Sequence, residues 1–237
     1  MTSFDTIGNI VIFSEEFKGI KDKAEELLKL KNIETVGVKT KFHSGTYRTR
    51  KIKIISGKRK KETAHKENNV IVKLNVETCY FSPRLSNERL RISKLIKKDE
   101  EVLVVGSGVG IYPLNFSKNS KAKEIIGIEI NPKAHKYALE NLKLNKVDNI
   151  KLYNGDAKKI LSKIRKKFDR IVIPMPSNSE EYLDLIKNKL KPKGIIHLYT
   201  FDNKEIDLKD FKVKKRIKCG SFGPGKFRIC LDLSIWF

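Results

Sequence analysis

The stretch "EVLVVGSGVG", from Glu101 to Gly110, joins a short strand-like run to a turn that contains three glycines. Gly106, Gly108 and Gly110 allow tight turning and a close approach of backbone N–H groups to a ligand where a helix begins. Taken alone, such a loop is a weak signal, because several classes of nucleotide-binding protein share it. The residues around it decide what it means.

A rhythm of strand, turn and helix continues after the glycine loop. Further strand-like runs begin at Glu124, Ile150, Phe168 and Lys193, so that there are five units in all. Such a series predicts an α/β fold with a parallel, doubly wound sheet. The last two strand-like runs, "FKVKKRIKCG" and "KFRICLDLSIWF", have no helix between them and are predicted to pair antiparallel. Tyr199 and Phe201 lie in the run that begins at Lys193, and Trp236 lies in the last run; all three are predicted to be core residues.

The segment before the glycine loop has a different pattern. "IGNIVIFS" and "YRTRKIKIISG" are strand-like, and "EEFKGIKDKAEELLKLK" has one apolar helical face. We interpret "GKRKKETAHKENN" as a charged loop or hairpin tip. The predicted organisation is a small α+β domain over residues 1–78, with a role in RNA binding, and a catalytic domain over residues 79–237.

The composition indicates a globular protein with an anionic partner. The formal net charge is +23 and the sequence pI is about 9.8. A nucleic acid fits this excess best, although lysines spread evenly over a solvated surface would produce it too. The three cysteines lack metal or disulfide spacing, which favours a reducing cytoplasm, and the four histidines, His43 among them, suggest no metal site. No apolar run is long enough for a membrane span.

Two acidic residues follow successive strands of the predicted sheet. Glu129 ends the second strand, where an acid can accept hydrogen bonds from ribose hydroxyls, and Asp156 follows the third, where an acid can accept from an adenine amine. Glu129 could instead be a solvated acid, and Asp156 a helix N-cap. Together with the glycine loop they favour a cofactor that contains adenosine.

The fourth strand ends in "VIPMPSN", from Val172 to Asn178. In open α/β sheets, ligands bind at the carboxyl ends of the strands. The run resembles the Asn-Pro-Pro-Tyr type of motif with which base-modifying methyltransferases hold a planar base, with Pro174 in place of the asparagine. Simple turn chemistry of the prolines is the alternative.

Several runs in order along the chain carry a family resemblance: "TYRTRKIKIISG", "YFSPRLSNERLRI", the glycine loop, "IEINPKAHKYALENLKLNKV", "GDA" and "GIIHLYTF". They resemble the archaeal and eukaryotic tRNA guanine-37 N1-methyltransferases. The resemblance implies a class I SAM-dependent methyltransferase fold, which is Rossmann-like, with S-adenosyl-L-methionine (SAM) as cofactor. It also implies a monomer that acts on the anticodon arm of tRNA without an obligatory metal. Members commonly begin with a domain that senses the tRNA elbow, for which we expect no room here.

The resemblance assigns roles to residues of this chain. Glu88 matches a general base, and Arg48 matches an arginine that holds the oxygen of the base and stabilises developing negative charge. The other implied contacts surround the cofactor and the base: Tyr80, Arg84, Arg89, Ile130, Ala157, Pro174, Met175 and Pro176. A carboxylate among Arg84, Arg89 and Arg91 is expected to be ionised at neutral pH. Glu88 could otherwise be a structural ion pair, and Arg48 a plain phosphate contact.

Two departures from the family pattern bear on the reaction. Val104 replaces an acid of the first strand motif, and Pro174 removes an amide that could bond the free amine of guanine. An archaeal subgroup with the proline methylates C7 of the tricyclic base 4-demethylwyosine at position 37, some members also methylating guanine N1. The chain is thus predicted to methylate one or both bases. The alternatives are an aminocarboxypropyltransferase of the wyosine pathway and a non-catalytic RNA-binding protein.

Overall fold

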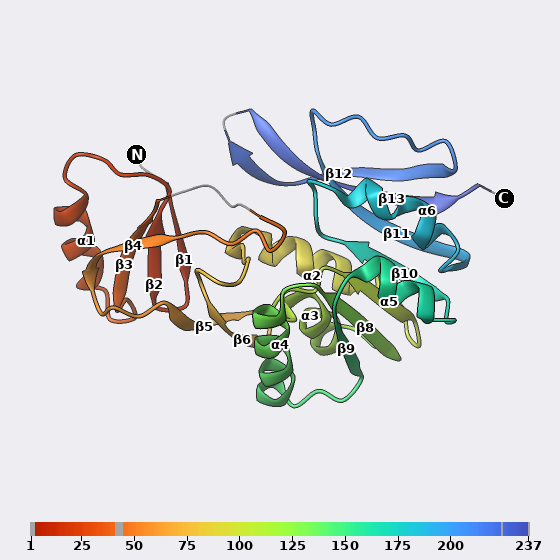
Figure 1. Cartoon of the computed structure of the whole chain (residues 1–237), viewed down its shortest axis with the longest axis horizontal. Helices are drawn as coiled ribbons and strands as arrows, with labels where there is room; N and C mark the ends of the chain where they lie inside the picture. The colour runs from red at the N-terminus through yellow and green to blue at the C-terminus, as the bar shows by residue number, and fades with distance from the viewer. Residues whose placement is uncertain (1–2, 41–44, 224, 237) are drawn as a thin grey trace.

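The computed structural model describes residues 3–40, 45–223 and 225–236. A small N-terminal sheet lies at one end of the molecule, and a larger α/β body forms the rest (Figure 1). The small sheet contains β1 (Phe4–Ile7), β2 (Ile10–Phe13), β3 (Thr35–Lys39) and β4 (Ile52–Gly57), in that order. Helix α1 (Ile20–Leu28) packs on one face of it, and the predicted apolar stripe is confirmed by the burial of Ala24 and Leu27.

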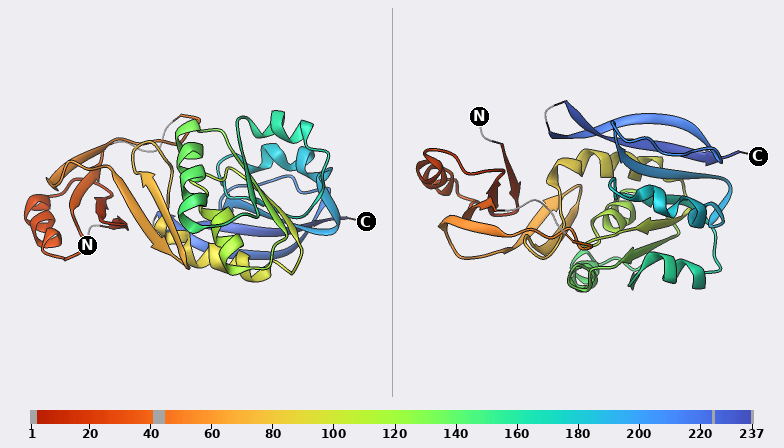
Figure 2. Two further views of the ribbon diagram at one scale, coloured as in Figure 1. Left: turned by 90° about the horizontal axis from the view of Figure 1, so that it is seen from below. Right: turned by 45° about the horizontal axis from the view of Figure 1, so that its top comes forward.

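A separate hairpin follows, where the sequence suggested a charged loop or hairpin tip. Strands β5 (Glu62–Glu67) and β6 (Val70–Asn75) pair antiparallel, so the run does hold the hairpin tip, but residues 62–67 form a strand where a loop was predicted. The tip is the pair Asn68 and Asn69, both with positive φ, which is the backbone of a tight two-residue hairpin turn. The hairpin lies beside α4 (Pro132–Asn145) in both views of Figure 2, and two asparagines of that helix bond to the backbone of β6.

The larger body is built on a seven-stranded sheet with the order β12-β13-β11-β10-β7-β8-β9. Its strands are β7 (Glu101–Val105), β8 (Glu124–Glu129), β9 (Ile150–Asn154), β10 (Phe168–Ile173), β11 (Leu190–Phe201), β12 (Phe211–Gly223) and β13 (Lys226–Ile235). β7 to β11 run parallel, and β13 pairs antiparallel with both β11 and β12. The predicted doubly wound sheet and terminal hairpin are both confirmed.

The remaining helices cover this sheet and place the loops of its carboxyl edge. They are η1 (Pro83–Leu85), α2 (Ser86–Leu95), α3 (Ile111–Asn119), α5 (Ala157–Lys163), η2 (Ser179–Tyr182) and α6 (Leu183–Lys187). Two apolar clusters result, and the first joins the small sheet, β6, α2 and α3 to the large sheet.

Of the aromatic residues predicted as core, Tyr199 is fully buried and Phe201 is half-buried. Trp236 is 57% exposed, which contradicts the prediction, because it follows the end of β13. Among the described residues, no helix is long and apolar enough to cross a membrane.

Candidate active site

The glycine loop connects β7 to α3 at the carboxyl edge of the sheet. Gly106 and Ser107 donate their backbone N–H groups to the carbonyl of Ile128 on the neighbouring strand. Gly106 has φ +81°, and a Cβ at this position would lie 2.6 Å from the Sδ of Met175. The proline-flanked Met175 therefore covers the loop, so the two motifs that the sequence analysis singled out meet in space.

Glu129 ends β8 directly beside this loop. Its carboxylate is buried and accepts the N–H of Gly108 at 2.7 Å and the N–H of Asn131 at 2.8 Å. Burial raises the pKa of Glu129, while these two hydrogen bonds favour the ionised form. Each carboxylate oxygen has a second lone pair, so a fixed acid beside a glycine loop fits the ribose of an adenosine cofactor.

The other residues predicted around the cofactor take varied positions. Asp156 is the N-cap of α5, since its side chain accepts the N–H of Lys158 at 2.8 Å. This is the alternative that the sequence left open, and an N-cap carboxylate still has acceptor capacity for an adenine amine. Ala157 is buried at the start of α5, and Ile130 is 39% exposed at the end of β8. Their contact with a cofactor stays a prediction.

A pocket of about 1030 Å³ lies between the small sheet and the β12–β13 hairpin. Arg48, Tyr80 and Arg84 line it, as do Phe201 and Arg228. The guanidinium carbon of Arg48 lies 4.8 Å from the centroid of the Tyr80 ring. Arg48 also has φ +50°, a left-handed backbone that costs a non-glycine residue about 1 kcal/mol or more. Three residues that the family resemblance implied thus share one pocket.

Glu88 does not line this pocket but is buried on α2. Arg91 donates Nε and Nη2 to its two carboxylate oxygens at 2.7 and 2.8 Å, and the Tyr199 hydroxyl donates at 2.7 Å. Of the three arginines expected around Glu88, only Arg91 bonds to it. Arg84 instead pairs with Asp5 at 2.6 Å. The structure therefore holds the predicted base by two donors, Arg91, which the sequence indicated, and Tyr199, which no sequence pattern indicated.

Arg89, predicted near the cofactor, forms the most buried ion pair of this region. Its Nε and Nη2 each donate to Glu67 of β5 at 2.5 Å, and Nη2 also donates to the carbonyl of Ser82. Burial opposes ionisation of Glu67, yet hydrogen bonds from His65 and Arg89 lower its pKa to about 2. The pair joins the β5–β6 hairpin to α2, and a contact between Arg89 and the cofactor stays a prediction.

His197, Cys230 and Asp232 come together inside the sheet, with their potential ligand atoms within 4.8 Å of one another. Nδ1 of His197 bonds to Asp232 at 2.6 Å, and Nε2 lies 2.6 Å from the Arg170 guanidinium. Since arginine only donates, Nε2 accepts and His197 is neutral, in agreement with burial lowering its pKa. Both nitrogens are engaged, and we interpret the group as a hydrogen-bonded network. His43 lies outside the described residues.

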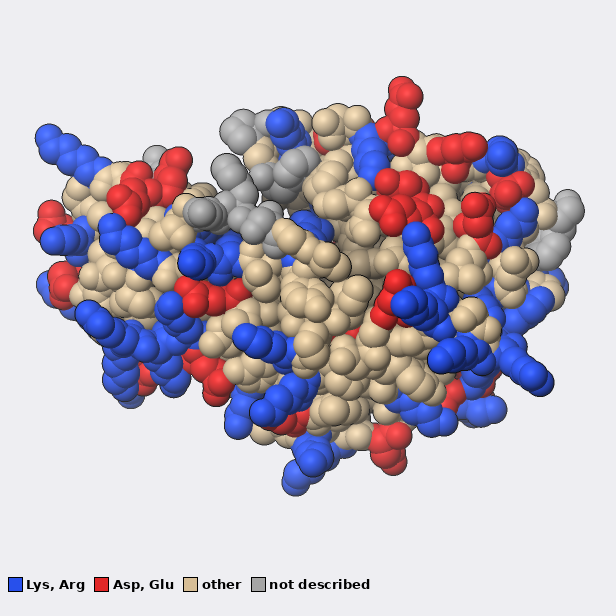
Figure 3. Space-filling model, viewed as in Figure 1, with Lys and Arg blue, Asp and Glu red and all other residues tan. Residues whose placement is uncertain are grey.

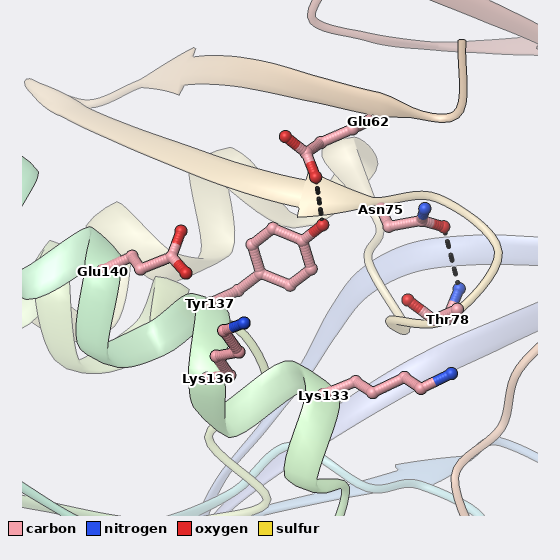
Figure 4. Close-up of a pocket in the computed structure, with 7 residues that line it drawn as sticks. All are labelled: Glu62, Asn75, Thr78, Lys133, Lys136, Tyr137 and Glu140. Carbon is pink, nitrogen blue, oxygen red and sulfur yellow. Dashed lines mark hydrogen bonds between the residues drawn. The ribbon is translucent and has the colours of Figure 1, made fainter. Parts of the chain in front are cut away.

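A second, smaller pocket of about 330 Å³ lies between the β5–β6 hairpin and α4. Figure 4 shows Tyr137 pointing its hydroxyl across this pocket to Glu62, with which it forms a hydrogen bond. Lys133 and Lys136 lie on the helix side. None of the residues predicted for catalysis or binding lines it.

A family model described as the TRM5/TYW2 methyltransferase domain matches residues 63–221. The chain belongs to the TRM5/TYW2 methyltransferase family. The match begins in β5 and covers the glycine loop, the α2 segment and the Pro-Met-Pro motif. Membership in the family agrees with the parallel sheet and its antiparallel hairpin.

Individual proteins of this family extend the likeness to the small sheet. A tRNA (guanine(37)-N(1))-methyltransferase, Trm5b of Pyrococcus abyssi, is 39% identical over 84% of this chain and 60% of its own length. The tRNA (guanine(37)-N(1))/4-demethylwyosine(37)-methyltransferase Taw22 of Nanoarchaeum equitans is 30% identical over 98% of this chain and 99% of its own length. The solved complex of aTrm5 and tRNALeu matches 99% of this chain and 72% of that chain, with a TM-score of 0.85 and 28% identity. The chain thus spans about three fifths of the first relative.

The positive charge of the pocket is part of a wider excess over the chain. Figure 3 shows Lys and Arg side chains spread over both the small sheet and the larger body on this face, with acidic side chains gathered at the upper right. On this face the excess is not confined to one patch. Arg50 and Arg228 in the pocket were not predicted from the sequence, although Arg50 follows Arg48 by two residues in the alternating run "YRTRKIKI".

The fit of the glycine loop under Met175 leads to a first experimental expectation. Gly106→Ala should weaken SAM binding about tenfold or more, because the new methyl group meets Met175 and the left-handed backbone costs about 1–2 kcal/mol. Calorimetric titration with SAM measures this. Gly45→Ala is the control, since Gly45 has φ +69° and no described atom within 4 Å of a Cβ. Met175→Ala should recover part of the loss in the double variant, and wild-type affinity in Gly106→Ala would contradict the close fit.

Proposed function

We propose that this protein is a SAM-dependent tRNA methyltransferase that acts on the purine at position 37 of the anticodon loop. The observation that carries the proposal is the pocket between the small sheet and the terminal hairpin, in which Arg48 lies with a strained backbone over Tyr80. Membership in the TRM5/TYW2 family supports it. The names of relatives support position 37 as the target.

The chemistry divides between cofactor and protein. When bound, SAM supplies a methyl group on a sulfonium, which needs no metal to be transferred. Arg48 would hold the oxygen of the base and stabilise the negative charge that develops there. Glu88 would take the proton from the ring, and the Arg91 and Tyr199 hydrogen bonds fix its carboxylate. For either base, the nucleotide must leave the stacked anticodon loop to be reached.

Pro174 favours the tricyclic base 4-demethylwyosine as a substrate, beside or instead of guanine. In the tricycle, the former N1 and amine are tied into a third ring, so an amide placed to bond a free amine would have no partner. A relative whose name includes both reactions matches nearly the full length of this chain. We therefore propose C7 methylation of 4-demethylwyosine, N1 methylation of guanine, or both.

The small N-terminal domain would contribute to binding of the anticodon arm, since its β3–β4 connection supplies Arg48 and its sheet lines one side of the pocket. The domain boundary predicted at residue 78 cuts after the β5–β6 hairpin, which packs on α4. We propose a boundary between β4 and β5 instead, so that the hairpin belongs to the catalytic domain. A monomer in the cytoplasm is the state that we propose for the enzyme.

Mass spectrometry of nucleosides from treated tRNA tests the function. One reaction contains SAM and an unmodified tRNA transcript, and another contains SAM and tRNA that carries the tricyclic base. We expect one added methyl group at position 37 in at least one of them. Gain of an aminocarboxypropyl group would instead identify the alternative transferase, and no gain in either reaction would contradict catalysis.

A further inference from the structure

The pocket beneath the small sheet has an unbalanced charge. The cationic residues that line it are Lys39, Arg48, Arg50, Arg84 and Arg228, and the acidic ones are Asp5, Glu15 and Glu16. Glu16 is already paired with Lys53, which is not among the lining residues. Arginine therefore dominates the pocket, and the distribution of these side chains decides where a ligand with negative charge would bind.

Asp5 is shared among several of these cations. Its carboxylate accepts Nε of Arg84 at 2.6 Å and Nζ of Lys39 at 3.2 Å. Burial raises the pKa of Asp5, but these two cations outweigh it and hold the pKa below its ordinary value. Asp5 also attracts Arg50 and favours its charged form. One carboxylate thus faces three positive groups, and Asp5 alone does not balance their charge.

Arg50 and Arg228 are the most enclosed members of the set, with 9% and 8% of their surface exposed. Among the described residues, the buried Nε of each has no hydrogen-bond partner. Burial lowers the pKa of Arg50, which means that its charge is poorly solvated. Keeping a buried guanidinium without full compensation destabilises a protein, and a bound anion removes that cost.

These arginines share the pocket with Tyr80. Nη2 of Arg228 lies 3.4 Å from the Tyr80 hydroxyl, Arg48 lies over the Tyr80 ring, and Arg50 lines the same pocket. The planar fork of a guanidinium matches the oxygens of a phosphate. None of the residues predicted for the ribose, the adenine or the glycine loop lines this pocket, so its anion is not expected to come from the cofactor.

We propose that Arg50 and Arg228 form a phosphodiester site, which binds the backbone of the nucleotide whose base enters the pocket. The inference rests on the proposed function, because tRNA supplies the phosphodiester. Arg48 serves the base, whereas Arg50 and Arg228 hold the backbone and set how deeply the nucleotide enters.

The test compares Arg50→Met and Arg228→Met with the wild-type chain. The affinity for a tRNA transcript is measured at salt concentrations from about 50 to 200 mM. Each variant should lose about tenfold in affinity at the lowest salt and should reduce the slope of log K against log salt by about one. The affinity for SAM alone should stay at the wild-type value. Arg165→Met is the control, since Arg165 is exposed in the loop before β10, at the opposite edge of the sheet, and should leave the slope unchanged.

The thermal stability of the Arg50 variants distinguishes an anion-binding site from a structural ion pair. The thermal midpoint of free Arg50→Met should equal or exceed that of the wild type, because the variant removes a poorly compensated buried charge. Arg50→Lys should keep the slope while losing part of the affinity, since the charge remains without the planar fork. An unchanged slope in both methionine variants, or an equal loss of SAM affinity, would overturn the phosphodiester site. If the salt slopes of the wild type and the variants differ as expected but the wild type transfers no methyl group, only the proposed function is contradicted and the phosphodiester site stands.

Discussion

Glu88→Gln is expected to lower kcat for tRNA methylation about 100- to 10,000-fold, while the affinities for tRNA and SAM change little. Glutamine keeps the size of the side chain, and its oxygen can still accept from Arg91 Nη2 and Tyr199, but its amide nitrogen can neither accept from Arg91 Nε nor take a proton from the base. Single-turnover rates with saturating tRNA and SAM measure the chemical step directly.

The competing interpretation is that Glu88 is only the partner of Arg91. In that case Glu88→Gln and Arg91→Gln should lower the unfolding midpoint together, with loss of activity in proportion to loss of folded protein. Tyr199→Phe separates the two interpretations further, because it removes one donor to Glu88 and should lower kcat by much less than Glu88→Gln. Glu140→Gln, an exposed change on α4, is the control. A Glu88→Gln enzyme with near wild-type kcat would exclude Glu88 as the base.

The surroundings of Glu88 show how far sequence reasoning can reach. Arg84, Arg89 and Arg91 all lie within four residues of it, and the sequence suggested that all three would surround the carboxylate. On a helix, residues three apart share a face, whereas adjacent residues point about 100° apart. Arg91 is therefore the partner of Glu88, and Arg89 is directed to Glu67. The Tyr199 contact spans 111 residues, and nothing local in the sequence indicates it.

The fold was more accessible than the site because its signals are local. The glycine turn, the Asn131 cap before Pro132 and the alternating terminal strands each follow from a few adjacent residues. Strand β5 was missed because its sequence, "ETAHKE", contains few apolar side chains. Its inward-facing Glu67 is a buried acid whose place depends on Arg89 and Asn115, which come from two different helices. Such a partnership is visible only in three dimensions.

The same buried pair gives the largest expected effect on stability. Arg89→Met should lower the free energy of unfolding by about 3–5 kcal/mol, since it leaves the Glu67 carboxylate buried without its cation. Urea unfolding at neutral pH measures this. Arg84→Met is the matched control, because Arg84 lies in the same segment and pairs with Asp5 at 2.6 Å but is exposed. Its loss should cost about 1 kcal/mol or less. Equal losses of unfolding free energy in the two variants would show that burial of the Arg89–Glu67 pair does not increase its contribution to stability.

Measuring the unfolding free energy as the pH is lowered tests whether the ionised Glu67 carboxylate causes this stability. The pKa of Glu67 is lowered from 4.5 to about 2 in the folded chain, so the unfolded chain binds the proton more readily. The ionised Glu67 carboxylate, with its hydrogen bonds from His65, Arg89 and Asn115, therefore contributes about 3 kcal/mol of stability above about pH 4.5, which is lost as the pH falls toward about 2. In Arg89→Met the folded pKa of Glu67 should rise, so unfolding free energies at pH 7 and at about pH 3 should differ less than in the wild type. Glu67→Gln should flatten the same part of the curve, because it removes the titrating group. If Arg89→Met instead kept the full acid dependence of the wild type, His65 and Asn115 would have to hold the ionised carboxylate without the arginine.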